Sequence, residues 1–184
     1  MTKPITEIKK IRKIASSLHK KGDEYFVLFS IGIQTGIPVN EVCLLKTSDI
    51  DFSKKCVKNY EHGCLGDTLA LQIRAYVMAN NLNDDDFLIS LPNRRDQPIN
   101  RIRLYRLLRK TGEAVGCPGL CEETIRKTFG YFHYQTHQDI KAIQGFFHQQ
   151  SPSITARYIG VDIAGKKSTS RPLALKLEDT KNAL

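Results

Sequence analysis

Apolar residues recur at three- and four-residue steps through most of this chain, and this spacing constrains the fold more than any other sequence feature. It is the period of an α-helix that buries one face. The clearest example lies at residues 5–20, where lysines and arginines fill the positions between the apolar residues. Residues 69–78, 100–115, 123–137 and 139–147 carry the same pattern. The sequence therefore predicts a mainly helical protein.

Glycine and proline residues indicate where further helices begin and end. An apolar run at residues 25–33 ends at Gly36, and Pro38 then suits the first turn of a new helix, where its missing N–H costs nothing. The apolar face of that helix would run from Val39 to Leu45. Another helix is predicted after Ser151 and Pro152, and a last short one near residues 173–184.

One stretch departs from the helical pattern. Residues 56–71 contain alternating apolar residues together with Gly63 and Gly66, which is typical of short strands joined by a turn. We expect a small antiparallel sheet there, followed by a polar loop at residues 80–86 and a short apolar segment at residues 87–91. Mostly helices with one early sheet place the chain in the α+β class, mainly helical.

Positive charge is the second constraint. The 184 residues include 28 Lys and Arg against 19 Asp and Glu, a net charge of +9 that favours an anionic partner such as nucleic acid. Residues 94–110 hold seven cations and one acid, Asp96, so this segment alone contributes +6. Within it, we expect a helix that begins with Asn100 as its N-cap and buries a stripe of Ile102, Tyr105 and Leu108.

Double-stranded DNA is the predicted partner of this helix, although an ordinary solvated face is the alternative. The predicted DNA contacts on it are Arg101, Arg103, Arg106, Arg109 and Lys110.

The five cysteines are odd in number and form no CxxC pair, which argues against a disulfide framework and a zinc ribbon. We expect reduced thiols in a cytoplasmic protein, because the N-terminus lacks the apolar stretch of a signal peptide and no run could span a membrane. His133 and His137 lie one helical turn apart, but no third metal ligand is evident. Neither a metal nor a cofactor is therefore predicted.

Three segments, taken in order, resemble the tyrosine recombinases, or phage integrases. They are residues 35–51 (TGIPVNEVCLLKTSDID), 123–131 (ETIRKTFGY) and 151–160 (SPSITARYIG). The resemblance covers roughly residues 5–160 and implies the family's catalytic-domain fold, a helical body with a small antiparallel sheet on one edge. It also implies an integrase-like domain at residues 1–160 and a tail at 161–184, which could be exchanged between the protomers of a homo-oligomer. The separate N-terminal domain of most members is expected to be absent.

The resemblance implies specific roles for individual residues. The family cleaves DNA with a tyrosine nucleophile, and the charge that grows on the phosphate requires two arginines and further donors. Tyr158 falls at the nucleophile and Arg126 at the second arginine. Pro38 stands where the first arginine belongs and can donate no hydrogen bond, and Glu123 replaces a histidine with a carboxylate that repels phosphate.

Other positions of the implied site are also altered. Gln149 stands at the position of a histidine or tryptophan, and His148 is one residue too early. His62 is the nearest substitute for the lysine of the sheet turn, although Lys54 and Lys58 are close by. Three further DNA contacts are implied: Arg126, Lys127 and Arg157.

The expected loss of reaction rate favours a protein that binds DNA without cleaving it. Loss of one preorganised donor costs a factor of about 10²–10³ in rate, so several changes together should remove most catalysis. The expected function is DNA binding on a degenerate recombinase scaffold, as a transcriptional regulator of a phage or mobile element. The alternatives are an active site-specific recombinase using Tyr158 and a non-catalytic accessory subunit. Tyr158 could also be a packed tyrosine, and Arg126 could pair with Glu122 or Glu123.

Overall fold

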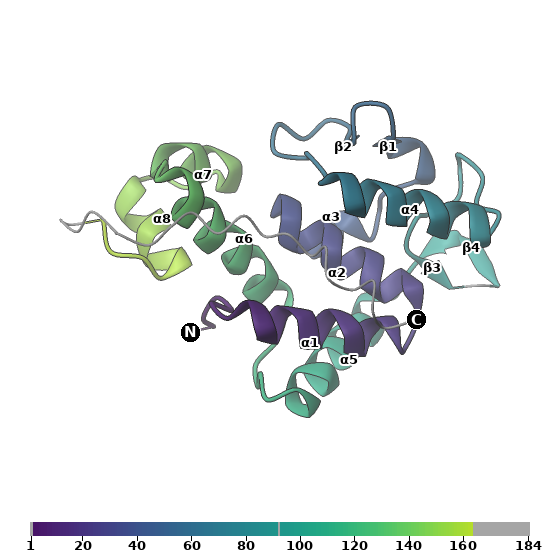
Figure 1. Ribbon diagram of the computed structural model, residues 1–184, viewed down its shortest axis with the longest axis horizontal. Coiled ribbons are helices and arrows are strands. Elements are labelled where there is room, and N and C mark those ends of the chain that lie inside the picture. Colours follow the sequence, from purple (N-terminus) through teal and green to yellow (C-terminus); the bar gives the residue numbers. More distant parts are fainter. Residues whose placement is uncertain (1, 92, 164–184) are drawn as a thin grey trace.

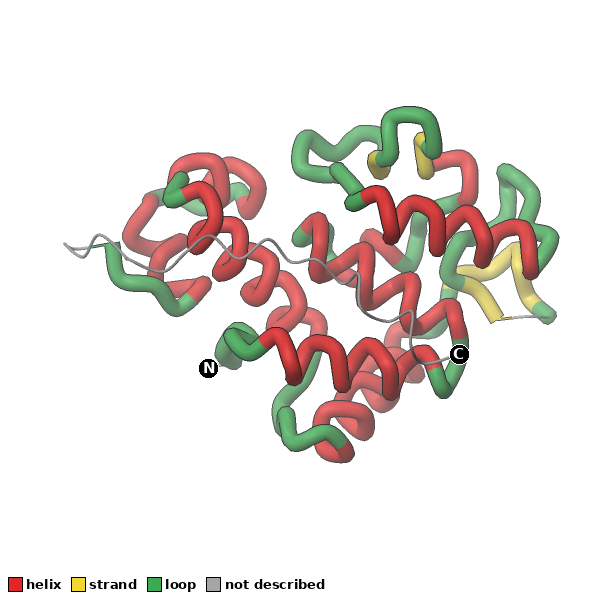
Figure 2. Tube along the Cα trace, viewed as in Figure 1, coloured by secondary structure: helices red, strands yellow, loops and turns green. Residues whose placement is uncertain are grey.

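The computed structural model describes residues 2–91 and 93–163, and it confirms the mainly helical α+β fold (Figures 1 and 2). The helices in these residues are α1 (Ile8–His19), α2 (Asp23–Thr35), α3 (Val39–Val42), α4 (Asp67–Ala79), α5 (Arg101–Ala114), α6 (Glu122–His137), α7 (Ile140–Phe147) and α8 (Pro152–Ile159), with a 3₁₀ turn at Thr47–Asp49. None of the helices in the described part of the chain is long and apolar enough to cross a membrane.

Helix α2 is the centre of the larger core. It is apolar on nearly every side and packs against α1, α3, α4 and α6, with α1 and α4 on opposite sides of it (Figure 1). A helix of this kind is stable only when other elements surround it. Helix α1 instead buries one stripe, which consists of Ile11, Ile14, Ala15 and Leu18.

The end of α2 confirms the predicted role of Gly36. Its φ of 68° is left-handed, and a side chain there would collide with Phe129. Pro38 then caps α3, but this helix is a single turn and does not extend to Leu45 as expected. The carbonyl of Leu45 instead accepts a hydrogen bond from the N–H of Leu88, because tertiary pairing with a distant segment replaces the helical hydrogen bond.

The early antiparallel sheet is confirmed, but its strands differ from the expected ones. Strand β2 (Cys56–Val57) pairs with β1 (Ile50–Asp51), which precedes the predicted segment, and Cys64 adds an isolated bridge to Cys56. A second hairpin of β3 (Ser90–Leu91) and β4 (Arg94–Pro98) was not predicted as a sheet. Most of β4 is exposed, so it carries no apolar alternation from which a strand could be recognised.

Helix α5 begins as predicted but buries a different face. The Asn100 side chain accepts hydrogen bonds from two backbone N–H groups of the first turn, as an N-cap does. The predicted apolar stripe is wrong, since Ile102 is 62% exposed and Tyr105 is 50% exposed. Leu104 and Leu108 are buried instead. Both stripes include Leu108 and have helical spacing, so packing against the neighbouring helices decided between them.

Helices α6, α7 and α8 enclose a second, smaller core. Its buried residues are Phe129, Ile143, Phe147 and Ile159, and Phe146 packs against it. Gly130 permits this packing, because a Cβ there would lie 2.6 Å from Ile159 Cγ2 and 2.9 Å from the Phe147 ring. The last helix predicted from sequence, at residues 173–184, lies outside the described residues.

Candidate functional site

Arg126 connects the two cores from its position on α6. Its guanidinium donates to the carbonyl of Gly36 at 2.5 Å and to that of Phe146 at 3.2 Å, and it lies 4.4 Å above the centre of the Phe147 ring. Burial lowers the pKa of Arg126, while Tyr158 and Glu41 oppose this effect.

The neighbouring carboxylates do not neutralise Arg126 by direct pairing. Glu122 pairs with Arg101 at 3.4 Å, and Glu123 pairs with Lys127 at 3.0 Å. The alternative in which Arg126 forms an ion pair with either glutamate is therefore wrong for this structure.

Tyr158 is half-buried on α8 beside Arg126. Its ring meets Phe147 edge-on at 5.6 Å, and the Lys127 ammonium lies 4.7 Å from the ring centre. Burial raises the pKa of Tyr158, Glu123 raises it further, and Arg126 opposes both. The phenol is thus harder to ionise than a free tyrosine, and ionisation is what a nucleophilic phenol requires.

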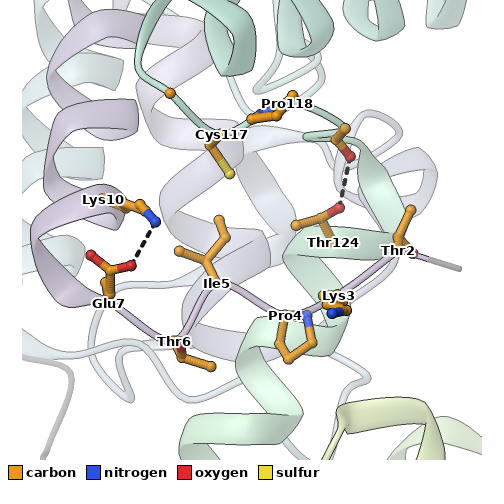
Figure 3. A pocket seen from close by; sticks show the side chains of 12 residues that line it. Thr2, Lys3, Pro4, Ile5, Thr6, Glu7, Lys10, Cys117, Pro118 and Thr124 are labelled. Carbon is orange, nitrogen blue, oxygen red and sulfur yellow. Dashed lines mark hydrogen bonds and ion pairs between the residues drawn. The ribbon is translucent and has the colours of Figure 1, made fainter.

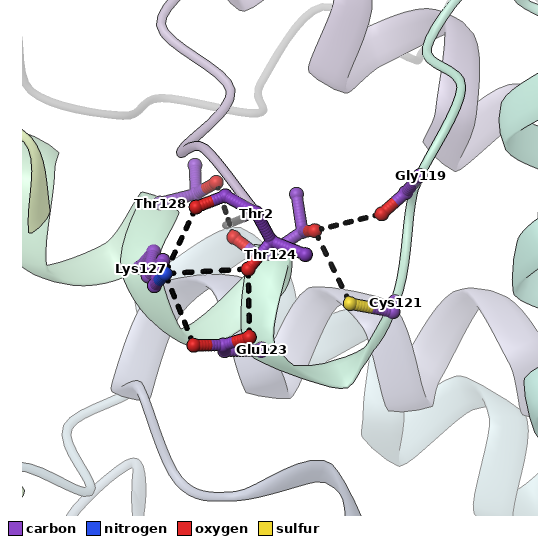
Figure 4. A network of polar contacts seen from close by, with 7 residues as sticks. All are labelled: Thr2, Gly119, Cys121, Glu123, Thr124, Lys127 and Thr128. Carbon is purple, nitrogen blue, oxygen red and sulfur yellow. Dashed lines mark hydrogen bonds and ion pairs between the residues drawn. The ribbon is translucent and has the colours of Figure 1, made fainter. Parts of the chain in front are cut away.

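Lys127 is the most buried cation of the region, with a side chain that is 1% exposed. Its ammonium donates to the carbonyl of Thr2 at 2.8 Å and to the Thr2 hydroxyl at 3.2 Å, and it pairs with Glu123 (Figure 4). The Thr2 hydroxyl donates in turn to Glu123 at 2.7 Å. The N-terminal segment covers the Lys127 ammonium in this structure, and a contact between Lys127 and DNA stays a prediction.

The N-terminal segment reaches Lys127 by running along α6. The N–H of Ile5 donates to the Thr128 hydroxyl at 2.9 Å, and Ile5 itself is buried. A pocket of about 510 Å³ separates this segment from the loop at residues 116–119 (Figure 3). None of the predicted catalytic residues lines this pocket, so the groups around Arg126 and Tyr158 remain the candidate site.

At Pro38, where the resemblance predicts that an arginine has been replaced, the residue offers only backbone groups for hydrogen bonding. The Pro38 carbonyl accepts from the N–H groups of Glu41 and Val42. Glu41, which the sequence reasoning missed, accepts a hydrogen bond from the Tyr60 hydroxyl at 2.8 Å and acts electrostatically on Arg126 and His62. An acid one helical turn after Pro38 was the sequence signal that could have revealed it.

His62 lies on the same side of the molecule as Arg126. Its ring is 4.6 Å from Phe146, and its Nε2 is buried without a hydrogen-bond partner among the described residues. Burial lowers the pKa of His62, and the charges of Arg126 and His148 lower it further. His62 therefore takes up a proton less readily than an exposed histidine.

His148 and Gln149 follow α7. His148 is exposed and has a left-handed backbone with φ of 52°. Gln149 is half-buried, and its Oε1 has no hydrogen-bond partner in the described part of the chain. Of these two, only His148 shows an electrostatic effect on the site, through His62.

The basic face of α5 adjoins the start of α6. All five predicted DNA contacts on α5 are exposed. Arg101 pairs with Glu122 and Arg109 with Glu113 at 3.1 Å, whereas Arg106 and Lys110 form no ion pair within the described residues. A pocket of about 400 Å³ between the two helix starts includes Ile102 and Tyr105. Arg157, on α8, is also exposed.

The histidines of α6 do not complete a metal site. The rings of His133 and His137 lie 4.6 Å apart. Across the described residues, no group of three His, Cys, Asp or Glu side chains could hold a metal ion.

Comparisons with known proteins agree on one family. The sequence profile described as "Phage integrase family" matches residues 5–164. "Probable integrase/recombinase YoeC" of Bacillus subtilis (strain 168) is 30% identical over 168 residues, which cover 88% of this chain and 91% of that protein. "Tyrosine recombinase XerA" of Pyrococcus horikoshii is 25% identical over 162 residues, which cover 84% of this chain and 55% of that protein.

Solved structures show the same fold. The crystal structure of XerA recombinase has a TM-score of 0.71 at 19% identity, and the match covers 89% of this chain and 62% of that one. The structure titled XerH site-specific recombinase bound to difH substrate, in a pre-cleavage complex, has a TM-score of 0.65 at 16% identity. That match covers 88% of this chain and 50% of the XerH chain. The chain thus spans about half to three-fifths of the length of these Xer proteins.

Proposed function

Because this chain belongs to the phage integrase family, we propose that it binds double-stranded DNA and does not cleave the strand that it binds. The basic face of α5, together with Arg157, would contact the phosphates. Arg126 and Tyr158 would occupy the family's catalytic positions without performing the reaction.

This proposal rests on how few positively charged side chains near Tyr158 are free to contact a phosphate. A strand-cleaving site needs several donors directed at the charge that develops on the phosphate. Here Pro38 offers no side-chain donor, and the ammonium of Lys127 is buried and paired with Glu123. Arg126 also lies close to Tyr158 and is not paired with Glu122 or Glu123, but two of its N–H groups already donate to backbone carbonyls.

DNA as the partner is supported by charge and by relatives. The five cations of α5 are all exposed, and contacts with phosphates supply much of the affinity of basic surfaces for DNA. The XerH structures, which share this fold, are titled as bound to difH substrate.

A DNA binder that leaves the strand intact can act only by occupying its site. The role that we propose is therefore regulation of transcription in a phage or another mobile element. The family description supports the association with phages. A protein that only occupies its DNA site could equally serve as a non-catalytic accessory subunit of a recombination complex.

Active recombination is the second candidate, and it agrees with the names of the relatives. Specific observations also favour it. The charge of Arg126 opposes the rise in the pKa of Tyr158, as an activating cation would. His62 lies near Arg126, and His148 lies near His62. In this candidate these histidines would donate protons that the missing side chains cannot supply.

A trapping experiment separates the two candidates. Genomic fragments that the purified protein retains would first be sequenced to obtain its site, and duplexes with a nick at each position of that site would then be incubated with the protein. We expect a shifted non-covalent complex and no band that survives denaturation. A denaturation-resistant adduct that disappears in Tyr158→Phe would establish the recombinase instead.

A further inference from the structure

Cys56 and Cys64 face each other across an antiparallel bridge at the base of a loop. Backbone hydrogen bonds flank the pair on both sides. They run from the Val57 N–H to the Gly63 carbonyl at 2.8 Å and from the Leu65 N–H to the Lys55 carbonyl at 2.7 Å. The cysteines themselves therefore occupy a non-hydrogen-bonded pair position.

This position suits a disulfide. The Cα atoms of a non-hydrogen-bonded pair lie about 4.5 Å apart, within the range of about 4.4–6.8 Å that disulfides require. Side chains at directly opposite positions point to the same face of the ladder. Both cysteines are free thiols, Cys64 is exposed and Cys56 is partly exposed, so a reagent in solution can reach them.

We propose that Cys56 and Cys64 form a reversible intrachain disulfide when the protein meets a small-molecule disulfide such as oxidised glutathione. The Cys64 thiolate attacks one glutathione sulfur and releases the other glutathione as a thiolate. The Cys56 thiolate then attacks the Cys64 sulfur and releases the second glutathione. Two electrons pass to glutathione, and the two protons lost from the cysteines end on the two glutathione thiols.

The bond closes a ring that contains part of the candidate site. The ring spans residues 56–64 and includes Tyr60, which donates to Glu41, and His62, whose ring lies against Phe146. A covalent link at the base of this loop holds these two side chains where the structure shows them. The proposal rests on backbone register alone, so it stands whether or not the protein cleaves DNA.

The other cysteines lack such a partner in the described residues. Cys43 is buried, and burial raises the pKa of its thiol to about 12. The Cys121 sulfur contacts the Thr124 hydroxyl at 3.4 Å, and burial raises the pKa of Cys117. Selective reaction at Cys56 and Cys64 is the expected outcome.

The test is oxidation of the folded protein followed by peptide mapping. The purified chain is incubated with oxidised glutathione, its remaining thiols are alkylated, and trypsin is added without reductant. Cleavage at Lys55, Lys58 and Arg74 places Cys56 in residues 56–58 and Cys64 in residues 59–74. We expect these two peptides to be recovered as one species, lighter than their sum by two hydrogen atoms and separated by dithiothreitol.

Matched variants identify the pair. Cys117→Ser should still form the bond, whereas Cys64→Ser should lose it. The oxidised protein should melt roughly 5 °C higher than the reduced protein, as expected for a closed short loop. Recovery of Cys56 and Cys64 as separate glutathione adducts or as alkylated thiols would overturn the proposal.

Discussion

At Tyr158, the neighbouring charges act on one phenol in opposite directions. Burial and Glu123 raise its pKa, whereas Arg126 lowers it. Lys127 lies over the ring, but its ammonium is paired with Glu123 and hydrogen-bonded to Thr2. Glu123 therefore opposes the effect of Arg126 on the pKa of the phenol, and the Lys127 ammonium is held by its own partners.

Restoration of donors tests this balance. Pro38→Arg with Glu123→His returns a guanidinium and removes the opposing carboxylate, so we expect a covalent DNA adduct to become detectable only in the double variant. The measurement is a denaturing gel after incubation with nicked duplexes. Addition of Tyr158→Phe to the double variant should abolish the band, and a band of equal strength in the unaltered protein would contradict the expectation.

Lys127 should matter for stability rather than for DNA binding. Lys127→Met keeps the volume but leaves Glu123 and the Thr2 carbonyl without their partner. We expect the free energy of unfolding to fall by about 2 kcal/mol, less than for a fully buried pair because Glu123 is partly exposed. Urea denaturation measures this loss. Lys141→Met, the same change at an exposed position of α7, should alter stability little.

Two half-buried histidines predict a dependence of stability on pH. Burial is the main cause that lowers the pKa of both His62 and His133. The unfolded chain, with ordinary pKa values of about 6.5, therefore takes up protons first as the pH falls. The stability that these residues contribute should be complete above pH ~7 and should decline as the pH falls through about 6.5 towards the folded pKa values.

The groups around these histidines set the size of the effect. Arg126 and His148 oppose protonation of His62, while Glu61 and Glu41 favour it. His137 and His62 oppose protonation of His133, while Asp139 favours it. Denaturation midpoints between pH 5 and 8 should vary less in a variant with His62→Gln and His133→Gln. A pH profile as steep in this double variant as in the unaltered protein would contradict the expectation.

At the scale of elements, α5 turns its cations to solvent and its leucines inward. Replacement of Arg103, Arg106 and Arg109 by Ala should lower DNA affinity and reduce the slope of log affinity against log salt by up to about 0.9 per lost phosphate contact. Binding titrations at several salt concentrations measure the slope.

The matched control for α5 lies on α1. Replacement of Lys9 and Lys13 on α1, and of Lys20 at its C-cap, by Ala removes the same charge from exposed positions. If this variant loses as much slope as the α5 variant, the effect is one of net charge and α5 is not the DNA-binding face.

For the whole molecule, the chain beyond α8 is the part that could connect one copy to another. The sequence of residues 161–184 includes Leu173, Leu175 and Leu177, and the resemblance predicts that this tail docks onto a second copy of the chain. We expect that a chain truncated after Gly160 still binds one DNA site but loses cooperativity on paired sites. Gel shifts with single and paired sites measure this, and circular dichroism confirms that the shortened chain is folded. Undiminished cooperativity would show that the tail has no such role.

The sequence by itself determined the helices and the family. The signals that predicted these helices are local: periodic apolar positions, the glycine at the end of α2 and the Asn100 cap. Local backbone preferences do not depend on residues that are distant in sequence. The three ordered motifs located Arg126 and Tyr158 for the same reason, because each motif is contiguous in the chain.

Only the tertiary structure decided which helix faces are buried and which side chains pair. The exposure of Ile102, the end of α3 before Leu45 and the burial of Lys127 all depend on segments distant in sequence. The partners of Lys127 show this most clearly, since Thr2 lies 125 residues away. The free energy of such contacts comes from burial and pairing between segments that meet only in the folded structure. The order of residues along the chain therefore does not reveal these contacts.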